Sequence, residues 1–481
     1  MAAEASQPIE TRLFINNEFR ESSDKKTFEV VFPYTKEVVA NVHQASVDDV
    51  NDAVAAGKAA FPAWRDLGVD GRAPYLRKLS ELFLEANNEL ARLETLSTGR
   101  PISQFVDAYM SSEIFRYYAD AAWNSQGTAS THTPGILSMT VKEPYGVVGL
   151  IIPWNFPLVM WSHKIAPAIA AGNTVVLKSS EKAPLTVIHP RRKTRPKSRL
   201  PPGVINIVAG YGNPTGTTLA EHMDIRCISF TGSSLTGQKI QVAAAKSNMK
   251  HCHMELGGKS PAVVFEDADL EAAATQTQFS IQFNSGQVCV ANSRVYVQES
   301  VYDKFVAIFR EKFAAVKLGD PLDPTTSHGP QIDALQYKRV QEYLGVGQKD
   351  ASLTQGGDAN DGFFVKPTIF EKVPEDSRLM REEVFGPVVA INTFKTEEEA
   401  VQKANDTEFG LYASVFTKDL DRAVRMSRAL QAGLVGVNCT SPTNAKDAAF
   451  GGYKMSGNTR EGLLYSMENF VQKKSILIKS G

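Results

Sequence analysis

The chain has 481 residues, 43% of them hydrophobic, and its 52 basic residues nearly balance its 53 acidic ones. A chain of this length and composition can build two or three domains with large buried cores, which excludes disorder as its overall class. The near-neutral balance gives no global attraction to nucleic acid or to an anionic membrane, so we expect neither as a partner.

The N-terminal stretch MAAEASQPIETRLFINNEF has no charged segment followed by an apolar core, and it has no Arg-rich amphipathic pattern. We therefore expect no secretory or organelle signal and a cytoplasmic location. The longest apolar stretches, GVVGLII and IAPAIAAG, are shorter than the roughly 20 residues that span a bilayer. The 4 cysteines are scattered along the chain, which argues against a disulfide framework.

Two helices are predicted near the start of the chain. Ser46 precedes Asp49 by three residues, as in a capping box, and Val50 and Val54 follow at helical spacing. A longer helix is predicted at about 71–96 from a stripe of leucine and phenylalanine.

From Gly146 onward, short apolar runs alternate with helix-sized spacers. These runs are GVVGLII, NTVVLKS, GVINIVAG, CISFTGS and PAVVF. Continuous apolar strands separated by helices indicate a parallel sheet covered on both faces, which is a doubly wound α/β fold. A second α/β block is predicted to follow, with a helix at about 299–318 and another that opens around Glu397–Asn405.

Cys289 lies in the segment FNSGQVCVANSR, three residues after Gly286. A loop of small and polar residues allows close approach of a substrate, as a covalent nucleophile requires. Taken alone, a cysteine in such a segment is more often an inert buried residue.

Two further segments carry candidate catalytic groups. Glu255 stands directly before the glycine pair in HMELGGKSP, where a carboxylate could act as a general base, although acids at strand ends are usually solvated. Asn155 lies between two prolines in PWNFP, and a rigid side-chain amide suits an oxyanion site. The structural alternative for PWNFP is a proline-stiffened turn.

Candidate nucleotide-binding groups follow two predicted strands. Lys178 and Glu181 stand at the end of NTVVLKS, where open α/β sheets commonly bind a ribose. Gly232 and Ser233 in FTGSSLTG precede a helix whose first N–H groups favour phosphate. The familiar GxGxxG spacing is absent, so this dinucleotide motif is weak by itself.

Together with EEVFGPV at 382–388 and FGGYKMSG at 450–457, these segments closely resemble the aldehyde dehydrogenase superfamily, from about residue 12 to the C-terminus. The resemblance implies an α/β fold with a doubly wound parallel-sheet cofactor domain, a second α/β catalytic domain and a small β oligomerisation extension. The implied ranges are 1–123 and 146–254 for the NAD-binding domain, 255–455 for the catalytic domain, and 124–145 and 456–481 for the oligomerisation hairpin and tail.

The resemblance also implies a reaction, the oxidation of an aldehyde to a carboxylic acid. Cys289 attacks the aldehyde, Asn155 and the Cys289 backbone N–H hold the thiohemiacetal oxyanion, and Glu255 activates water to hydrolyse the resulting thioester. Lys178 and Glu181 are implied to hold the adenosine ribose. The remaining implied cofactor residues are Trp154, Gly232 and Ser233 at the diphosphate, and Glu383 and Phe385 at the nicotinamide.

Two choices follow from single residues. Glu181 can accept hydrogen bonds from both ribose hydroxyls and would repel a 2′-phosphate, so NAD is expected and NADP is less favoured. Glu255 favours hydrolysis, because family members that transfer the acyl group to coenzyme A generally lack a base at that position.

The implied aldehyde channel ends in the segment CTSPTNA, and its substrate is left open. His163 and Thr443 stand where relatives often have aromatic residues, which indicates a wider or more polar channel; the alternative is surface-loop variation. The implied lining residues are Phe156, Met160, His163, Phe283, Val288, Val290 and Thr443.

The segment HCHME superficially suggests a metal site, but on a strand its two histidines project to one face and Cys252 to the other, so no metal is expected. Cys227 and Cys439 are interpreted as small buried hydrophobic residues. The C-terminal KKSILIK is strand-like and, by resemblance, pairs with the hairpin at about 124–145 to build a homodimer or homotetramer.

Residues 189–200 disagree with their surroundings, because Pro190, Pro196 and six basic residues replace the helix expected beside the adenine. Their abrupt start and end suggest a reading-frame shift: codons exist for which RRKTRPKSRL, shifted by one base, reads AEKLVQKAGF. A nuclear-localisation or nucleic-acid segment is a second interpretation. A third is a catalytically impaired member of the family that acts as a structural or interaction protein. For an active enzyme we expect weakened NAD affinity with near-normal turnover at saturation.

Overall fold

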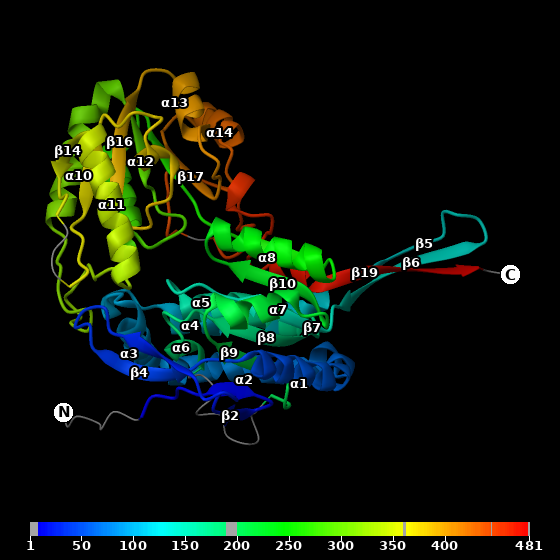
Figure 1. Cartoon of the computed structure of the whole chain (residues 1–481). Coiled ribbons are helices and arrows are strands. Elements are labelled where there is room, and N and C mark those ends of the chain that lie inside the picture. The colour runs from blue at the N-terminus through cyan, green and yellow to red at the C-terminus, as the bar shows by residue number, and fades with distance from the viewer. Residues whose placement is uncertain (1–7, 189–199, 359–361, 444, 480–481) are drawn as a thin grey trace.

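Two large sheets and a small projecting one organise the molecule (Figure 1). The computed structural model describes residues 8–188, 200–358, 362–443 and 445–479. The basic run at 189–199 lies outside these residues, so its interpretations remain predictions.

The first sheet has the order β11-β10-β7-β8-β9-β1-β2, and the strands from β11 to β9 are parallel. Its central strands are buried on both faces, which explains their continuous apolar sequences. The strands are β1 (Leu13–Ile15), β2 (Glu18–Arg20), β7 (Val147–Ile151), β8 (Thr174–Ser179), β9 (Ile205–Ala209), β10 (Ile225–Thr231) and β11 (His251–Glu255).

The chain order within this sheet creates a switch point. From β7 it proceeds to β8 and β9, and it then returns past β7 to β10 and β11. Because crossovers between parallel strands are right-handed, the two directions place their helices on opposite faces. Ligands bind at the carboxyl ends of strands at such a point, which here lies between β7 and β10.

Helices surround this sheet and form the lower part of Figure 1. They are α1 (Val47–Asp66), α2 (Gly68–Glu85), α3 (Asn87–Thr98), α4 (Asp107–Ala121), α5 (Pro157–Ala170), α6 (Leu185–Ile188), α7 (Thr217–Glu221) and α8 (Ser234–Ser247). The capping box predicted at Ser46 and Asp49 is confirmed at the start of α1. A two-stranded sheet of β3 (Thr27–Val31) and β4 (Val38–His43) lies at the edge of this part.

The prediction of one helix over 71–96 is wrong, because α2 and α3 are separate. Ala86 has φ −97° and ψ 5°, outside the helical range, and Asn87 and Asn88 follow it. Asparagine side chains compete for backbone hydrogen bonds and so favour helix ends. The helix predicted over 299–318 is shorter, since a 3-10 turn precedes α10 (Tyr302–Ala314).

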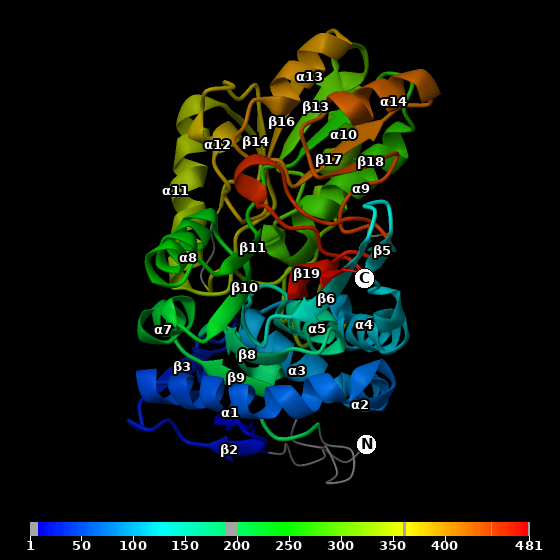
Figure 2. The ribbon, with the colours of Figure 1, turned by 90° about the vertical axis from the view of Figure 1, so that its right-hand side faces the viewer.

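The second sheet has the order β14-β15-β16-β13-β12-β17-β18 and is parallel except for β14. Its strands are β12 (Pro261–Val264), β13 (Arg294–Gln298), β14 (Ser352–Gln355), β15 (Thr368–Glu371), β16 (Val388–Phe394), β17 (Tyr412–Phe416) and β18 (Leu434–Val437). Its helices are α9 (Leu270–Gln282), α10, α11 (Ala334–Asp350), α12 (Arg378–Arg381), α13 (Glu397–Asn405) and α14 (Leu420–Ala429), and Figure 2 shows them around the sheet. The helix predicted to open around Glu397–Asn405 is confirmed, since α13 begins at Glu397.

The third sheet projects from the body as an arm, to the right in Figure 1. It joins β5 (Thr128–Ser130), β6 (Ile136–Pro144) and β19 (Val471–Lys479) in the order β19-β6-β5. The tail thus pairs with the hairpin, as the family resemblance implies, and the pairing is antiparallel, with Val471 opposite Pro144 and Lys479 opposite Ile136.

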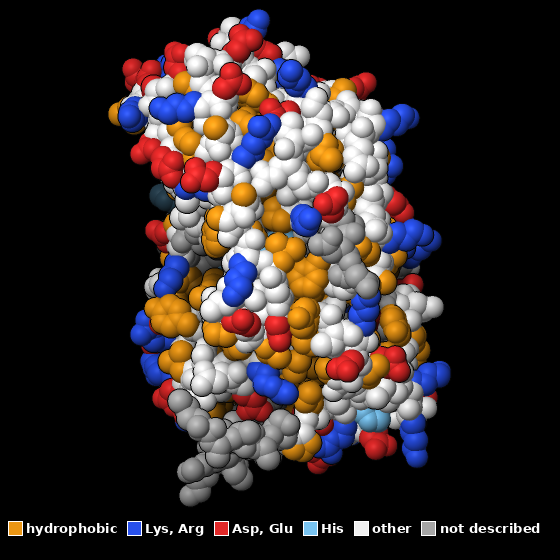
Figure 3. Space-filling model, turned by 90° about the vertical axis from the view of Figure 1, so that its left-hand side faces the viewer, with side chains coloured by type: hydrophobic (Ala, Val, Ile, Leu, Met, Phe, Trp, Pro, Cys, Tyr) orange, Lys and Arg blue, Asp and Glu red, His pale blue; other side chains and the backbone are white. Residues whose placement is uncertain are grey.

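Charges of both signs are interspersed over the face shown in Figure 3. This distribution agrees with the near-neutral composition. Among the described residues, the structure contains no helix that is long and apolar enough to cross a membrane.

Candidate active site

The candidate nucleophile follows a strained loop between α9 and β13. Asn284, Ser285 and Gly286 have successive positive φ angles of 47°, 55° and 74°. Glycine is required at the third position, because a Cβ there would lie 2.1 Å from the carbonyl carbon of Gly386. Left-handed backbone at non-glycine residues persists only where surrounding contacts enforce it. Cys289 follows this loop and lies half-buried at the amino edge of the second sheet.

Neighbouring residues supply the contacts that hold this loop. The Ser285 hydroxyl donates to the Gly329 carbonyl over 2.7 Å. The Gln287 side-chain oxygen accepts from the Ile332 N–H over 2.9 Å. Residues that precede α11, a helix of the second sheet, therefore hold this loop in place.

Asn155 stands between β7 and α5, at the switch point of the first sheet, and is 5% exposed. Its side-chain nitrogen donates to the Gln287 carbonyl over 3.0 Å, two residues before Cys289. The Asn284 side chain returns a hydrogen bond of 3.2 Å to the Asn155 carbonyl. A side-chain amide has two N–H donors, so one remains for an oxyanion beside the thiol.

Glu255 ends β11 and is 1% exposed, and its Oε1 has no hydrogen-bond partner. Burial, and secondarily the negative charge of Glu461, raises the pKa of Glu255 to about 8. The glycine turn after Glu255 packs on the nucleophile, because a Cβ at Gly258 would lie 2.2 Å from the Cys289 carbonyl oxygen. Burial, with the charges of Glu255 and Glu383, raises the pKa of the Cys289 thiol. The resting thiol is therefore protonated and needs a base to ionise it.

A buried ion pair that the sequence analysis missed lies behind Glu255. Lys164 Nζ on α5 contacts the Glu461 carboxylate over 2.8 Å and the Ser229 hydroxyl over 2.9 Å. Lys164 lowers the pKa of Glu255, in opposition to Glu461. A lone lysine inside the apolar helix sequence VMWSHKIAPAIA was the available signal, since buried lysines need partners.

The C-terminal segment also covers the free edge of β11. The Met254 N–H donates to the Asn458 side chain over 2.9 Å, and the Leu256 N–H donates to the Ser456 carbonyl over 3.0 Å. Glu255 forms a β-bridge with Gly457. The strand that carries the candidate base is thus held on both sides.

The predicted ribose-binding residues lie together at the end of β8. Lys178 Nζ is 4.0 Å from Glu181 Oε2 and donates to the Ser179 carbonyl over 3.0 Å. Burial lowers the pKa of Lys178 to about 8. The Glu181 side chain is 28% exposed, so its carboxylate can reach a ligand.

The predicted diphosphate and nicotinamide residues border the same switch point. Ser233 caps α8, whose first turn contains no acidic residue, so its partial positive charge is available to an anion. The Gly232 N–H donates to the Glu255 carbonyl over 3.1 Å, which ties this loop to the candidate base. The Trp154 ring meets that of Phe385 edge-on, with centroids 5.3 Å apart. These donors and carboxylates fit a dinucleotide with a diphosphate.

Glu383 is oriented by the glycine turn that follows Glu255. Its Oε1 accepts from the Gly258 N–H over 2.8 Å, and a Cβ at Gly257 would lie 2.3 Å from its Oε2. Burial raises the pKa of Glu383 to about 7. Glycine is therefore needed at position 257 for the carboxylate to reach its backbone donor.

Four of the predicted channel residues lie in one hydrophobic cluster with Cys289. Phe156 and Phe283 stack with centroids 5.8 Å apart, and both pack with Cys289 on the hydrophobic cluster that contains Val288 and Val290. Met160 packs instead on the hydrophobic core of the first sheet, burial lowers the pKa of His163, and Thr443 is exposed.

The remaining cysteine and histidine predictions have separate outcomes. Cys227 is buried as predicted, whereas Cys439 is only half-buried, so that part of the prediction is wrong. His251 to Glu255 form a strand, as the interpretation of HCHME assumed. The described part of the chain contains no group of His, Cys, Asp and Glu residues arranged to hold a metal.

Comparison with known proteins agrees with this geometry. Residues 19–476 match the model of the aldehyde dehydrogenase family. An aldehyde dehydrogenase of Emericella nidulans is 44% identical over 98% of this chain and 95% of its own length. The human mitochondrial aldehyde dehydrogenase is 43% identical over 97% of this chain and 92% of its own length.

Solved structures show the same likeness. An indole-3-acetaldehyde dehydrogenase from P. syringae, solved as a mutant in complex with NAD+ and IAA, has a TM-score of 0.96 and 38% identity. The superposition covers 98% of this chain and 97% of that one. The KauB aldehyde dehydrogenase of Pseudomonas aeruginosa has a TM-score of 0.96 and 39% identity, with coverages of 98% and 97%. This chain therefore belongs to the aldehyde dehydrogenase family of oxidoreductases.

Proposed function

We propose that the chain oxidises an aldehyde to a carboxylic acid with NAD and water. The observation that supports this best is the convergence of Cys289, the Asn155 amide and the Glu255 carboxylate, whose Oε1 has no hydrogen-bond partner, between the carboxyl edge of one sheet and the amino edge of the other. A nucleophile, an oxyanion donor and a base in one buried place are the parts that acyl chemistry requires.

In the first step the ionised form of Glu255, which becomes populated as the pH approaches its raised pKa of about 8, takes the proton of the Cys289 thiol, and the thiolate attacks the aldehyde carbonyl. The Asn155 amide and the Cys289 N–H hold the oxyanion that forms. When bound, NAD supplies the hydride acceptor that converts this thiohemiacetal into a thioester. Once its first proton has passed to solvent, Glu255 removes a proton from water, whose attack releases the acid, and Glu255 returns this proton to the leaving Cys289 thiolate.

The same proposal assigns the cofactor residues. Lys178 and Glu181 hold the adenosine ribose, Trp154, Gly232 and Ser233 border the diphosphate, and Glu383 and Phe385 border the nicotinamide. NAD is favoured over NADP because the Glu181 carboxylate would repel a 2′-phosphate. Solved relatives in complex with NAD+ support the use of this cofactor.

Phe156, Phe283, Val288 and Val290 form one wall of the proposed aldehyde channel, and Met160, His163 and Thr443 are proposed to continue it outward.

The proposed domains are 1–123 with 146–254, 255–455, and the arm of 124–145 with 456–481. The outer edge of β19 in this arm is available to pair with a second copy, which supports a homodimer or homotetramer.

A cytoplasmic location is part of the proposal, although several relatives are mitochondrial proteins. Imaging a tagged full-length chain tests this location.

The direct test is NADH production from a panel of aliphatic and aromatic aldehydes, with Cys289→Ala as the control. We expect an absorbance increase that the substitution reduces by about 10⁴-fold or more, because the covalent step is lost. Activity that persists in Cys289→Ala would contradict the proposed nucleophile. Absence of NADH from every aldehyde at saturating NAD would favour the structural or interaction protein instead.

A further inference from the structure

Residues 99–104, between α3 and α4, connect the two large parts of the molecule. They run from the part built on the first sheet to the part built on the second sheet, which we call the catalytic part. Gly99 ends α3 in the left-handed region, with φ 73°. The Ile102 N–H then donates to the Pro321 carbonyl over 2.8 Å, and the Ser103 hydroxyl donates to the Thr326 carbonyl over 2.8 Å. We call residues 99–104 the crossing segment.

Gln104, the last residue of the crossing segment, reaches the strained loop before the nucleophile. Its side-chain nitrogen donates to the Ser327 carbonyl over 2.8 Å, and its side-chain oxygen accepts from the Asn284 N–H over 3.1 Å. The first bond determines which way the amide faces, because only its nitrogen can donate to a carbonyl. Gln104 thus fixes the backbone of Asn284, the first left-handed residue of the loop.

Asn284 passes this constraint on to the proposed oxyanion site. Its side-chain nitrogen lies 3.2 Å from the Asn155 carbonyl and 3.4 Å from the Gln287 carbonyl. The Asn155 side chain donates to the same Gln287 carbonyl over 3.0 Å. Gln104, Asn284 and Asn155 therefore form a continuous series of hydrogen bonds that ends at the proposed oxyanion donor.

We propose that Gln104 is a positioning residue, which holds Asn284 so that the Asn155 amide points to the carbonyl oxygen of a substrate bound to Cys289. This inference rests on the proposed function of Asn155 and Cys289. Gln104 itself need not touch the substrate. Its role is to keep the Asn155 amide in position, because a hydrogen-bond donor stabilises a developing oxyanion only when it is placed accurately.

Ser103 provides a matched control within the same segment. Its hydroxyl also bonds to the other part of the molecule, at the Thr326 carbonyl, which lies outside the loop of Asn284. Loss of either side chain removes a bond between the two parts, whereas loss of Gln104 also removes a bond to the Asn284 backbone. Gln104→Met keeps the length of the side chain without its acceptor, and Ser103→Ala removes the control bond.

The experiment compares two reactions of Cys289 in the full-length protein. Acylation by p-nitrophenyl acetate passes through an oxyanion, whereas alkylation by iodoacetamide does not. We expect Gln104→Met to slow acylation about tenfold and to leave alkylation within about twofold, with an unchanged KM for NAD. Ser103→Ala should change neither reaction. Gln104→Glu, which keeps an acceptor for the Asn284 N–H, should recover part of the acylation rate.

Three outcomes would overturn the inference: an unchanged acylation rate in Gln104→Met, an equal fall of both reactions, or an equal effect of Ser103→Ala. The melting temperature of each variant shows whether a lower reaction rate comes from unfolding. If Gln104→Met is unfolded, the rates of acylation and alkylation are compared in Gln104→Glu instead. Failure of the proposed function looks different, because ester hydrolysis by the parent protein would then be unaffected by Cys289→Ala and Asn155→Ala.

Discussion

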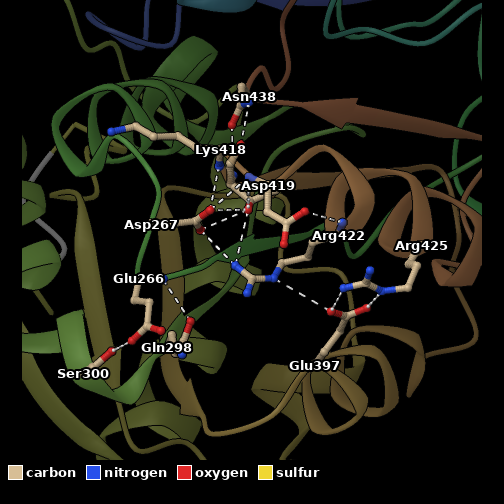
Figure 4. A network of polar contacts seen from close by, with 11 residues as sticks. Glu266, Asp267, Gln298, Ser300, Glu397, Lys418, Asp419, Arg422, Arg425 and Asn438 are labelled. Atoms are coloured by element: carbon tan, nitrogen blue, oxygen red, sulfur yellow. Dashed lines mark hydrogen bonds and ion pairs between the residues drawn. The ribbon is translucent and has the colours of Figure 1, made fainter.

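Two carboxylates that lie near opposite edges of the second sheet, Asp267 and Glu255, have opposite environments. At the carboxyl edge, Asp267 accepts from the Thr417 hydroxyl at 2.8 Å, the Lys418 and Asp419 N–H groups at 2.9 and 3.0 Å, and Arg422 at 3.0 Å (Figure 4). Partial burial raises the pKa of Asp267, but these donors outweigh it, so the net shift is downward. Near the amino edge, Glu255 is buried with an unpaired oxygen, and its pKa is raised.

The difference shows what makes a carboxylate structural or reactive in this fold. A carboxylate that receives several donors is stabilised as an anion and has little tendency to take a proton. Glu397 is a second example, since Arg425 binds both its oxygens over 2.9 Å. Glu255 has no such donors at Oε1, so it can exchange a proton near neutral pH.

The largest expected effect is on catalysis. Glu255→Gln should slow hydrolysis of the thioester by about 10³-fold, because a general base is lost while the thiol remains. Rapid-quench measurement should show that acylated Cys289 forms more slowly than in the parent, because Glu255 also takes the thiol proton, and that it persists while hydrolysis is slow. Asp267→Asn is the matched control, and its turnover should stay within about twofold of the parent. Equal losses in both variants would refute the functional distinction between the two edges.

A buried carboxylate that has a partner offers a test of the comparison. Arg100 contacts Glu94 over 2.7 Å and also pairs with Asp107, and all three side chains are at most 2% exposed. Arg100→Met leaves both acids without their cation, so we expect a loss of about 4 kcal/mol in unfolding free energy. Urea denaturation measures this loss; a cost below about 1 kcal/mol would mean that the pairing contributes little.

The pH dependence of stability should have opposite signs at the two edges. Between its ordinary value and about 8, Glu255 keeps its proton in the folded state and ionises in the unfolded state. The parent should therefore lose about 3 kcal/mol relative to Glu255→Gln as the pH rises from 5 to 8. Denaturation curves of both proteins at the two pH values measure this difference, and parallel pH profiles would contradict the buried, protonated state of Glu255.

Asp267 should show the smallest effect, in the reverse direction. Its lowered pKa means that its stabilisation is complete above the ordinary aspartate value and is lost as the pH falls through the folded-state value. Asp267→Asn should cost about 1 kcal/mol at pH 7 and less near pH 3. A cost that grew on acidification would show that the anion is not the bonded form.

The parts predictable from sequence were those encoded locally. The apolar runs identified the central strands, and the residues after β7, β8 and β10 meet because parallel strands place their carboxyl ends at one edge. The pair of Lys164 with Glu461 joins residues 297 positions apart, so no local pattern encodes it. The link from Gln104 to Asn284 spans 180 positions and depends equally on the finished fold. The break at Ala86 was missed because the apolar stripe continues across it.

The edge position of β11 also has a consequence for folding during synthesis. Asn458 covers this strand and Glu461 pairs with Lys164, yet the ribosome makes them 204 residues after Met254 and 297 residues after Lys164, respectively. Until they emerge, the growing chain has a free strand edge and a lysine without its counter-charge in the core of the first sheet. A chain that lacks these two residues is therefore prone to pair with other chains through β11, and the emergence of Asn458 and Glu461 ends that exposure.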